Sequence, residues 1–584
     1  MAICRYNSLQ KAALLSDFES EILLKHLARL FASNGLLQAR GTLTIPWISY
    51  VNKLHHVNEY EEFTGEQITY IDEALSLFEK AMGAISDFQD GSSSGTFSLD
   101  EIQNILESKG FKRELKTYQL DNVHFLASRK AGATFSVPGA GKTTEALAYF
   151  ALTSEPEDEL IVISPINAFV AWNDEIQGCY DDSSLTFTQI DSTQSSAVAK
   201  ILNSNSKRFI VNYDKLDKIK QSLFDYMMQN NVFVFLDESH YIKSESSIRT
   251  KAALSFSQLP AAKLILTGTP LPNSLVDLIS QMKFLYPEVH VEEYDVVEKI
   301  KSIYVRTTRP QLKIPDGVFT PVVVPLPEGL RRIHRVFQND IVRNVNYGSA
   351  TAIANIKKSV MLLLQLTSNP LLLLDRIMDI PSFPVELLED ISSPKIDYVC
   401  DRARSIVADK EKVVIWSMFR KNITTLQYRL QDLNSKIIMG GIDSSERSES
   451  IKSFNNDSDC NIIIINPAAG SEGISLHHNC HRAIYVDRSF NAVHWLQSQD
   501  RIRRIGQSRT PKFELLIHPN TIDDRVEHRL DEKIIRMQSV LDDPSIKVER
   551  EPLSYVDDGD VGKATDLGID LDDIRYLIES FNHG

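Results

Sequence analysis

Residues 136–150 read SVPGAGKTTEALAYF, and this stretch predicts both a fold and a kind of site. It follows a strand-like ATF and opens a helix, which is the setting that a phosphate-binding loop requires. Gly139 and Gly141 would let backbone N–H groups approach phosphate oxygens, Lys142 would reach the β- and γ-phosphates, and Thr143 would ligate Mg²⁺. The sequence therefore predicts a nucleotide site at the end of a parallel strand.

An acidic pair follows a second apolar strand, in NVFVFLDESH at 231–240. Asp237 would hold Mg²⁺ through water, and Glu238 would polarise the attacking water. On its own, an Asp-Glu pair at a strand end is more typical of a solvated turn. The phosphate-binding loop upstream reverses that preference, so we expect an ATP-hydrolysing site.

Short apolar strands alternate with helices in two runs, which predicts parallel strands with crossover helices. The first run contains ELIVISP, KRFIVNY, VFVFLDE and KLILTGT, and the second contains KVVIWSM, CNIIIINP and HRAIYVD. The interval between them has KKSVMLLLQL at its centre and reads as helical. The predicted domains are a first lobe at 111–309, a helical insertion at 310–394 and a second lobe at 395–540.

The two flanks are acidic in a chain of 584 residues and formal net charge -15. Residues 1–110 carry 8 Lys and Arg against 15 Asp and Glu, and residues 541–584 carry 4 against 12. Helical periodicity predicts an all-α accessory domain at 1–110, with DGSSSG at 90–95 as a linker. The remaining 541–584 form an acidic tail with a terminal amphipathic helix. The expected fold class is α/β, with two parallel-sheet lobes, a helical insertion and an all-α N-terminal domain.

Composition narrows the class of protein. Hydrophobic residues at 43% and charged residues at 24% are ordinary for a globular chain. The five cysteines show no spacing suited to zinc or disulfides, no apolar run could span a bilayer, and no signal-peptide pattern is present, so we expect a cytoplasmic protein of bacterial type. The acidic total argues against coating nucleic acid, although the neutral central part can hold a local basic groove.

The motifs together resemble the Swi/Snf (sucrose-non-fermenting) family of superfamily-two, helicase-like ATPases. The resemblance covers roughly residues 111–540 and implies two RecA-like lobes that bind ATP and DNA. The stretches that carry it are LKTYQLDNV, SVPGAGKT, ISPINAFVAWNDEI, FIVNYDKL, LDESHYIKSESSIRTKAAL, LILTGTPLPNSLVDLISQMKFLYP, LLLQLTSNPLLL, KVVIWSMF, INPAAGSEGISL and QSQDRIRRIGQ.

This resemblance implies further residues of the ATP site. Gln119 becomes the adenine-recognising glutamine, and Arg501 and Arg504 become arginine fingers that stabilise charge on the transferred phosphoryl group. If QSQDRIRRIGQ is helical, Gln497 shares a face with both arginines, whereas Arg503 points to solvent. The predicted catalytic residues are Lys142, Asp237, Glu238, Gln497, Arg501 and Arg504. The predicted nucleotide contacts are Tyr118, Gln119, Pro138, Gly139, Ala140, Gly141, Lys142, Thr143, Thr144 and Gly473, with Thr143 and Asp237 as Mg²⁺ ligands.

The same resemblance implies that DNA lies across both lobes and is contacted mainly at its phosphates. For Trp172, packing inside the lobe is an equal alternative to stacking on DNA. The predicted DNA contacts are Ser164, Pro165, Trp172, Lys243, Thr267, Gly268, Thr269, Asn273, Ala469, Gly470 and Ser471. The chain departs from the family pattern at Ser136, where the usual loop has its first glycine, at Ser239, at Ala492 and in AGSEG.

The sequence thus predicts an ATP-dependent translocase on double-stranded DNA. A strand-separating helicase is the alternative within enzymes, and a scaffold switched by nucleotide is the alternative from another class. The acidic flanks are predicted to dock protein partners. No histone-reading module or nuclear-type basic cluster is recognisable, which favours, by analogy, a bacterial or phage-related motor in a multi-protein system such as antiviral defence.

Overall fold

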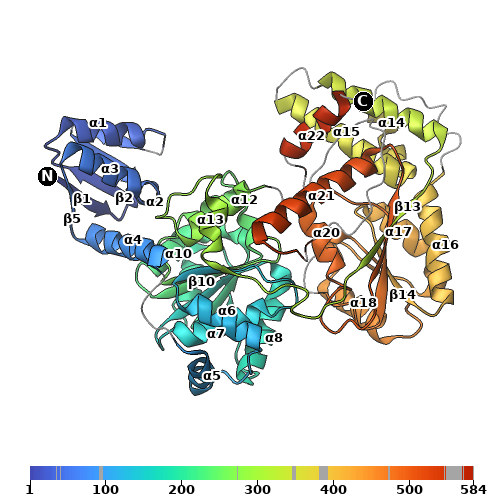
Figure 1. Cartoon of the computed structure of the whole chain (residues 1–584), viewed down its shortest axis with the longest axis horizontal. Coiled ribbons are helices and arrows are strands. Elements are labelled where there is room, and N and C mark those ends of the chain that lie inside the picture. Colours follow the sequence, from blue (N-terminus) through green and yellow to red (C-terminus); the bar gives the residue numbers. More distant parts are fainter. Residues whose placement is uncertain are drawn as a thin grey trace. The chain divides into compact units, whose positions relative to one another are not determined.

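The computed structural model describes residues 1–33, 36–39, 41–90, 97–271, 274–344, 350–379, 392–470, 474–544, 546, 569 and 571–582. They belong to two compact units, Met1–Thr307 and Thr308–Gly584 (Figure 1). Asn273, Ser471 and Gly473 lie outside the described residues. None of the helices in the described ranges is long and apolar enough to cross a membrane.

The N-terminal part of the first unit contains a mixed five-stranded sheet, so the prediction of an all-α domain is wrong (Figure 1). The strand order is β3-β4-β2-β1-β5, and only the β1–β5 pair is parallel. The elements are β1 (Ala2–Asn7), β2 (Ala12–Ser16), α1 (Glu21–Leu30), β3 (Leu37–Ala39), β4 (Thr42–Pro46), α2 (Trp47–Val51), α3 (Leu54–Thr64), β5 (Ile68–Tyr70) and α4 (Glu73–Asp90).

The cause of this error lies in β2. Its sequence AALLS is a continuous apolar run, which periodicity cannot distinguish from a buried helical turn. In the structure β2 pairs with β1 on one side and β4 on the other, so it is a central strand with Ala12, Ala13 and Leu15 buried. Pairing with strands that are distant in sequence overrides the local helical pattern.

Helix α4 joins the N-terminal sheet to the first lobe through a buried carboxylate. Asp87 accepts the backbone N–H of Lys130 at 3.2 and 3.1 Å and the hydroxyl of Tyr286 at 2.7 Å. Burial of a carboxylate is unfavourable unless such donors surround it. Residues 73–90 are therefore part of the support of the first lobe.

The first lobe is built on a seven-stranded sheet in which every pair is parallel, as predicted. Its order, β12-β6-β11-β10-β7-β9-β8, requires helical crossovers between strands. The strands are β6 (Ala131–Thr134), β7 (Glu159–Ile163), β8 (Thr188–Gln189), β9 (Arg208–Val211), β10 (Val232–Asp237), β11 (Ala262–Leu266) and β12 (Tyr304–Val305). The helices include α5 (Leu99–Ser108), α6 (Thr117–Ala127), α7 (Lys142–Thr153), α8 (Phe169–Tyr180), α9 (Ser195–Leu202), α10 (Leu216–Met227), α11 (Ile248–Leu254), α12 (Val276–Leu285) and α13 (Val296–Lys301).

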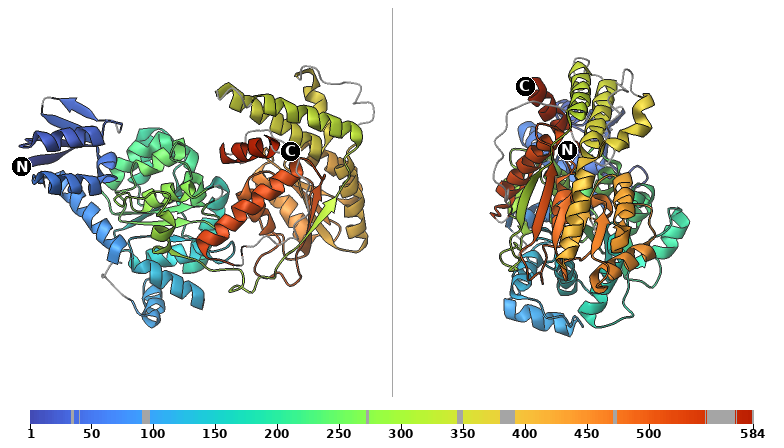
Figure 2. Two further views of the ribbon diagram at one scale, coloured as in Figure 1. Left: turned by 45° about the horizontal axis from the view of Figure 1, so that its top comes forward. Right: turned by 90° about the vertical axis from the view of Figure 1, so that its right-hand side faces the viewer.

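The second unit contains a six-stranded parallel sheet with helices on both faces (Figure 2), which confirms the second predicted parallel sheet. The order is β13-β18-β17-β14-β16-β15. The strands are β13 (Val318–Val323), β14 (Lys412–Trp416), β15 (Lys436–Ile438), β16 (Ile462–Ile465), β17 (Cys480–Tyr485) and β18 (Lys512–Ile517). The helices include α14 (Glu328–Asn344), α15 (Ala350–Ser368), α16 (Pro394–Ala408), α17 (Arg420–Arg429), α18 (Ser444–Asn456), α19 (Pro467–Gly470), α20 (Ala492–Gln499), α21 (Ile522–Leu541) and α22 (Leu571–Asn582). Strand β13 comes from the interval that was expected to be helical.

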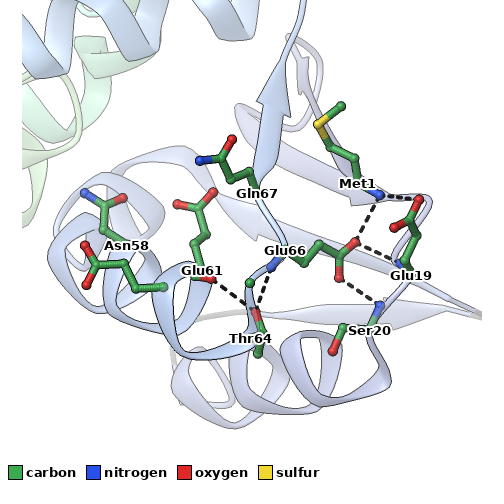
Figure 3. A pocket seen from close by; sticks show the side chains of 10 residues that line it. Met1, Glu19, Ser20, Asn58, Glu61, Thr64, Glu66 and Gln67 are labelled. Atoms are coloured by element: carbon green, nitrogen blue, oxygen red, sulfur yellow. Dashed lines mark hydrogen bonds and ion pairs between the residues drawn. The ribbon is translucent and has the colours of Figure 1, made fainter.

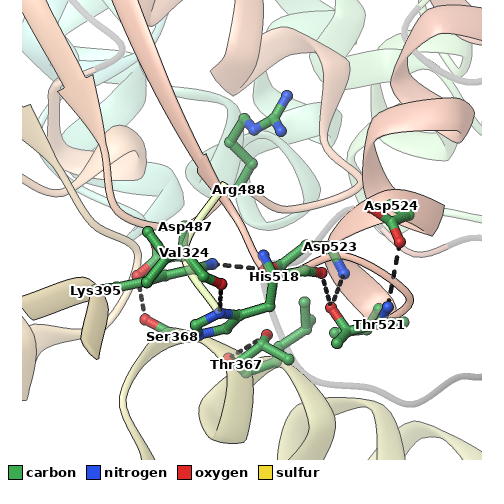
Figure 4. A network of polar contacts seen from close by, with 12 residues as sticks. Val324, Thr367, Ser368, Lys395, Asp487, Arg488, His518, Thr521, Asp523 and Asp524 are labelled. Carbon is green, nitrogen blue, oxygen red and sulfur yellow. Dashed lines mark hydrogen bonds and ion pairs between the residues drawn. The ribbon is translucent and has the colours of Figure 1, made fainter. Parts of the chain in front are cut away.

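Buried polar contacts join the helices of the second unit to one another and to the end of β17 (Figure 4). The Lys395 ammonium donates to Asp523 Oδ2 at 2.6 Å, and the Ser368 hydroxyl of α15 donates to Asp487 beyond β17. Helix α22 is held by Asp573, which accepts from Arg529 at 2.5 Å and from Lys533 at 2.8 Å. Ionised groups are stable inside a protein when they are paired in this way.

Candidate active site

The phosphate-binding loop lies between the carboxyl end of β6 and the first turn of α7. Gly139 and Gly141 have φ of 87° and 90°, in the left-handed region that favours glycine. A Cβ on Gly141 would also lie 2.4 Å from Gln119 Nε2. Both glycines are therefore required by the backbone, and Gly141 also by its neighbour.

Two residues predicted to contact the nucleotide base lie against this loop. The Tyr118 hydroxyl donates to Ala140 O at 3.0 Å, and Gln119 Nε2 donates to the same carbonyl at 3.3 Å. Gln119 Oε1 accepts the backbone N–H of Lys116 at 3.0 Å, which fixes the amide. Helix α6 thus places both side chains beside the loop.

The loop lysine folds back over its own loop. Lys142 Nζ donates to Ser136 O at 3.0 Å. Thr143 lies in the first turn of α7, where free N–H groups and the helix dipole favour an anion. Thr144 is buried and its hydroxyl donates to Glu175, so it faces the lobe interior. Pro138 packs beside Gly268, where an added Cβ would lie 3.1 Å from Pro138 Cδ.

The acidic pair ends strand β10, and the protein holds one carboxylate firmly. Asp237 Oδ2 accepts Trp172 Nε1–H at 2.9 Å and the Ser164 hydroxyl at 2.8 Å, and Oδ1 accepts the backbone N–H of Glu238 at 3.0 Å. Glu238 has φ of 50°, a conformation that costs energy in a residue with a side chain and that occurs often at functional sites.

Ser164 and Trp172 were predicted to contact DNA, but the structure places both side chains inside the lobe. Their exposed fractions are 0% and 1%. Trp172 also packs edge-on against Phe187, with ring centroids 5.7 Å apart. In the structure both side chains donate hydrogen bonds to Asp237 and so orient it. For Trp172, this position is the alternative of packing inside the lobe.

The electrostatics of Asp237 suit a cation. Burial and the neighbouring Glu238 raise the pKa of Asp237 to about 6, while the hydrogen bonds from Trp172 and Ser164 and the charge of Lys142 lower it. A carboxylate oxygen and the Thr143 hydroxyl are hard donors of the kind that Mg²⁺ prefers. The described residues hold no cluster of three His, Cys, Asp or Glu able to bind a metal alone. Mg²⁺ in nucleotide sites commonly uses one or two protein oxygens together with phosphates, so this donor set fits it.

The TGTP loop is joined to the acidic pair. The Thr267 hydroxyl lies 3.4 Å from Glu238 Oε2 and 3.1 Å from His240 Nδ1, and it accepts the backbone N–H of Thr269 at 3.1 Å. His240 Nδ1 lies 3.3 Å from Glu238 Oε2. Thr267 and Thr269, predicted as DNA contacts, are therefore buried next to the residue predicted to activate water.

The prediction of a shared face assumes one helix over the arginine-rich stretch, but only its first part is helical. Helix α20 ends at Gln499, and residues 501–506 form turns closed by Gly506, whose φ is 93°. Even so, Arg501 Nη1 and Arg504 Nη1 both lie close to Ile474 O, at 3.1 and 3.5 Å. Burial lowers the pKa of Arg504, and Asp500 opposes that effect.

The prediction that Arg503 faces solvent is wrong. Its side chain is 2% exposed, and Nη2 donates to Asp316 Oδ1 at 2.8 Å. Turns replace the helix here, so the direction of this side chain cannot be taken from helical spacing. Gln497 is buried, and its carbonyl accepts Arg501 Nε–H at 3.1 Å.

The other predicted DNA contacts have mixed surroundings. Gly470 is buried, and a Cβ there would lie 2.6 Å from Ile465 Cγ2. Ala469 O accepts Arg447 Nη2–H at 2.7 Å. Pro165 is buried, and Lys243 is partly exposed after the acidic box.

Sequence reasoning missed a buried acid beside the loop. Glu145 stands one turn after Lys142 and is fully buried, with Asn122 Nδ2 donating to it at 2.8 Å and the Thr134 hydroxyl at 3.1 Å. Burial raises its pKa to about 7. A single acid inside the apolar run TTEALAYF is a signal that could have identified it.

The described residues also line hollows away from this site. One, in the N-terminal domain, has four glutamates among its ten lining residues, but the Glu66 oxygens already accept the backbone N–H groups of Glu19 and Ser20, both at 2.8 Å (Figure 3). Another lies at the carboxyl ends of β14, β16 and β17, with Arg420 and Arg488 among its lining residues. The nucleotide loop and acidic pair remain the candidate active site.

The fold and this site define a class of two-lobed, nucleotide-binding α/β protein, and family comparisons specify the class. The SNF2-related domain matches residues 118–371, and the helicase conserved C-terminal domain matches residues 394–506. Together they cover more than half of the chain. The chain belongs to the SNF2-related family and carries a helicase conserved C-terminal domain.

Individual relatives are distant. The chain is 22% identical to ATP-dependent helicase fft1 of Schizosaccharomyces pombe, over 75% of this chain and 54% of that protein. It is 22% identical to the ISWI chromatin-remodeling complex ATPase ISW1 of Saccharomyces cerevisiae, over 73% and 40%. The chain thus spans about half the length of these relatives, or less. The Sulfolobus solfataricus SWI2/SNF2 ATPase core in complex with dsDNA aligns at 20% identity over 76% of this chain and 96% of that one, with a TM-score of 0.33.

Proposed function

We propose that the chain is a motor that hydrolyses ATP and uses the energy to move along double-stranded DNA without fully separating the strands. The observation that carries the proposal is the meeting of the glycine loop, Lys142 and the Asp237–Glu238 pair at the carboxyl end of one parallel sheet. Ligands of open α/β sheets bind at this edge. Membership in the SNF2-related family supports DNA as the track.

This proposal assigns a role to each active-site residue of the first lobe. Lys142 leaves Ser136 O and pairs with the β- and γ-phosphates, while the loop N–H groups hold the same oxygens. Asp237 and Thr143 would hold Mg²⁺, which would supply neutralisation of the phosphate charge. Glu238 accepts a proton from the attacking water, and Thr267 and His240 orient its carboxylate.

In this proposal the second lobe supplies two further cations. Arg501 and Arg504 carry planar, permanently charged guanidinium groups, which suit the charge that spreads over a transferring phosphoryl group. Both guanidinium groups contact the Ile474 carbonyl, which is neutral. A charged phosphate would bind them more strongly and could replace this contact. Hydrolysis then depends on the approach of the two lobes, which is how the reaction is coupled to movement.

The proposal extends to partners. We infer that the acidic N-terminal domain and tail contact other proteins of a larger assembly, with antiviral defence as a setting suggested by analogy.

Deletion of residues 1–72 should leave ATP hydrolysis intact because α4 stays in place. Deletion of residues 1–95 should instead destabilise the first lobe, since it removes Asp87. Equal hydrolysis and equal melting temperatures for the two truncations would contradict this role of α4.

Movement on duplex DNA is tested by displacement of a triplex-forming strand, and strand separation by release of one strand of a forked duplex. The proposal expects ATP-dependent triplex displacement, its loss in Glu238→Gln, and no strand release. Release of a duplex strand would instead favour the strand-separating helicase. Absence of both activities, with hydrolysis retained, would contradict movement.

A further inference from the structure

One short stretch of backbone connects the phosphate-binding loop to the second unit. Strand β12 lies beside β6, and the hydrogen bonds continue beyond both strands into the loop. The Phe135 N–H donates to Val305 O at 2.9 Å, and the Val137 N–H donates to Thr307 O at 3.0 Å. The chain that leaves the first unit at Thr307 is thus paired with the first residues of the loop.

The unusual loop residue Ser136 makes a side-chain bond to this stretch. Its hydroxyl oxygen accepts the Thr307 N–H at 2.9 Å and lies 3.2 Å from the Thr134 hydroxyl. Ser136 is fully buried, and its carbonyl is the acceptor for Lys142 Nζ. A glycine, which the usual loop has here, could not accept the Thr307 N–H in this way. The departure from the pattern therefore has a structural use.

Two residues further along, the chain is anchored inside the second unit. Arg309 Nη2 donates to Asp500 Oδ1 at 2.9 Å, and the two side chains are 7% and 5% exposed. Asp500 immediately precedes Arg501, and its charge acts on the Arg504 guanidinium. Loss of one partner from a buried pair leaves an uncompensated charge, so this contact is fixed tightly.

We propose that Thr307–Arg309 is a coupling strap, which transmits the state of the phosphate-binding loop to the turn that carries Arg501 and Arg504. Ser136 and Arg309 are its two positioning residues. The inference deepens the proposed function and rests on it, because it assigns a regulated position to the two arginines.

A linker that only keeps two lobes together needs no buried side-chain contacts, and a flexible Gly/Ser segment would serve. Here both ends are held by buried polar bonds, with only Thr308 between them. A shift of Ser136 when phosphate enters the loop therefore acts on Arg309, and through Asp500 on the arginine turn. Networks of packed and hydrogen-bonded groups carry coupling between sites when they have two discrete arrangements, and the proposal assigns two such arrangements to this strap.

The test begins at the end of the strap that lies in the second unit. Arg309→Gln should lower the kcat of DNA-stimulated hydrolysis at least tenfold, while the Kd of a fluorescent ATP analogue stays within twofold. Arg309→Lys keeps the charge and should recover a large part of the lost kcat. A global loss of stability would instead lower kcat and nucleotide affinity together.

The other end provides an independent variant. Ser136→Ala removes the acceptor for Thr307 and should also lower kcat more than it weakens nucleotide binding. Because the two contacts act in series, the double variant Ser136→Ala/Arg309→Gln should lose no more than the worse single variant. Multiplicative losses would mean two unrelated defects and would overturn the strap.

A matched control is the buried Lys395–Asp523 pair of the second unit, which lies off the strap (Figure 4). Lys395→Gln should lower the melting temperature as Arg309→Gln does and keep kcat within twofold. A tenfold loss of kcat in this control would make the Arg309 effect one of stability and overturn the inference. The inference would also be overturned if both strap variants kept the parent kcat while Arg504→Ala was inactive. Normal hydrolysis by Arg504→Ala would contradict the proposed function itself, and the inference with it.

Discussion

Each parallel sheet has an aspartate at the carboxyl end of a central strand, and the two aspartates differ in their surroundings. Asp237 ends β10 and accepts from Trp172 and Ser164, with Glu238 and Lys142 beside it. Asp487 follows β17 and accepts the N–H of Met418 at 2.6 Å and the hydroxyls of Ser368 and Ser417. Burial raises the pKa of both carboxyls.

The difference shows that position in the fold does not assign a function. The hydrogen-bond donors to Asp487 are neutral groups, and one of them belongs to α15, so Asp487 fastens a helix to the sheet. Asp237 lies beside a second acid and the lysine of a glycine-rich loop, where a cation and a phosphate fit. The neighbours decide which aspartate takes part in chemistry.

The largest expected effect is on hydrolysis. Asp237→Asn and Glu238→Gln should each lower kcat by about 10²-fold or more, the range typical of losing a positioned acid or base. Steady-state phosphate release measures it. Asp487→Asn is the matched control and should keep kcat within threefold. A comparable loss in Asp487→Asn would erase the distinction between the two aspartates.

The effect of Asp487→Asn should instead be on stability. Asp487→Asn replaces an acceptor oxygen by an amide that cannot accept from the donors around it, which should cost roughly 1–3 kcal/mol. Urea denaturation of the second unit, followed by tryptophan fluorescence, gives the free energy of unfolding. A variant as stable as the parent would show that the Asp487 contacts do not fasten α15.

Glu145 extends the comparison to pH. Its pKa is raised from 4.5 to about 7 in the folded protein, so between these values the folded state binds more protons than the unfolded state. Its contribution to stability is therefore present at low pH and is lost as the pH rises through about 7. Glu145→Gln should flatten this dependence and be more stable at pH 8 by roughly 1–3 kcal/mol. If the free energy of unfolding had the same pH dependence in the parent and in Glu145→Gln, the raised pKa of Glu145 would be refuted.

The smallest effect concerns the support of Asp237. Trp172→Phe removes a hydrogen bond that lowers the pKa of Asp237, so the ionised form should become scarcer at pH 6 than at pH 8. We expect a loss of kcat of about threefold to tenfold at pH 6, with a smaller loss at pH 8. Tyr149→Phe, which removes a hydroxyl bond to Arg129 O in the same lobe, is the control. An identical pH profile in Trp172→Phe would contradict the orienting role.

The sequence predicts those parts of the fold that depend on a few neighbouring residues. Apolar strands that end in motif residues predicted both parallel sheets, and Gly139 and Gly141 predicted the loop, because strand burial and positive φ are set within a few residues. The N-terminal sheet was missed because β2 has no alternation of its own. It becomes a strand only through its partners β1 and β4.

The partners of buried polar groups could not be predicted in the same way. Ser136 and Thr307 are 171 residues apart, and Ser368 and Asp487 are 119 residues apart. Arg503 was assigned to solvent from an assumed helical spacing, whereas a turn directs it to Asp316. Which hydroxyl or guanidinium meets which acceptor depends on tertiary packing, and one sequence does not report it.

The most direct test of the central claim is steady-state ATP hydrolysis by the purified protein, measured without nucleic acid and with single-stranded DNA, double-stranded DNA or RNA. The account predicts strong stimulation by double-stranded DNA and no hydrolysis by Lys142→Ala under any condition. Normal hydrolysis by Lys142→Ala would contradict the active site. Hydrolysis by the parent protein that no nucleic acid stimulates would contradict the DNA motor.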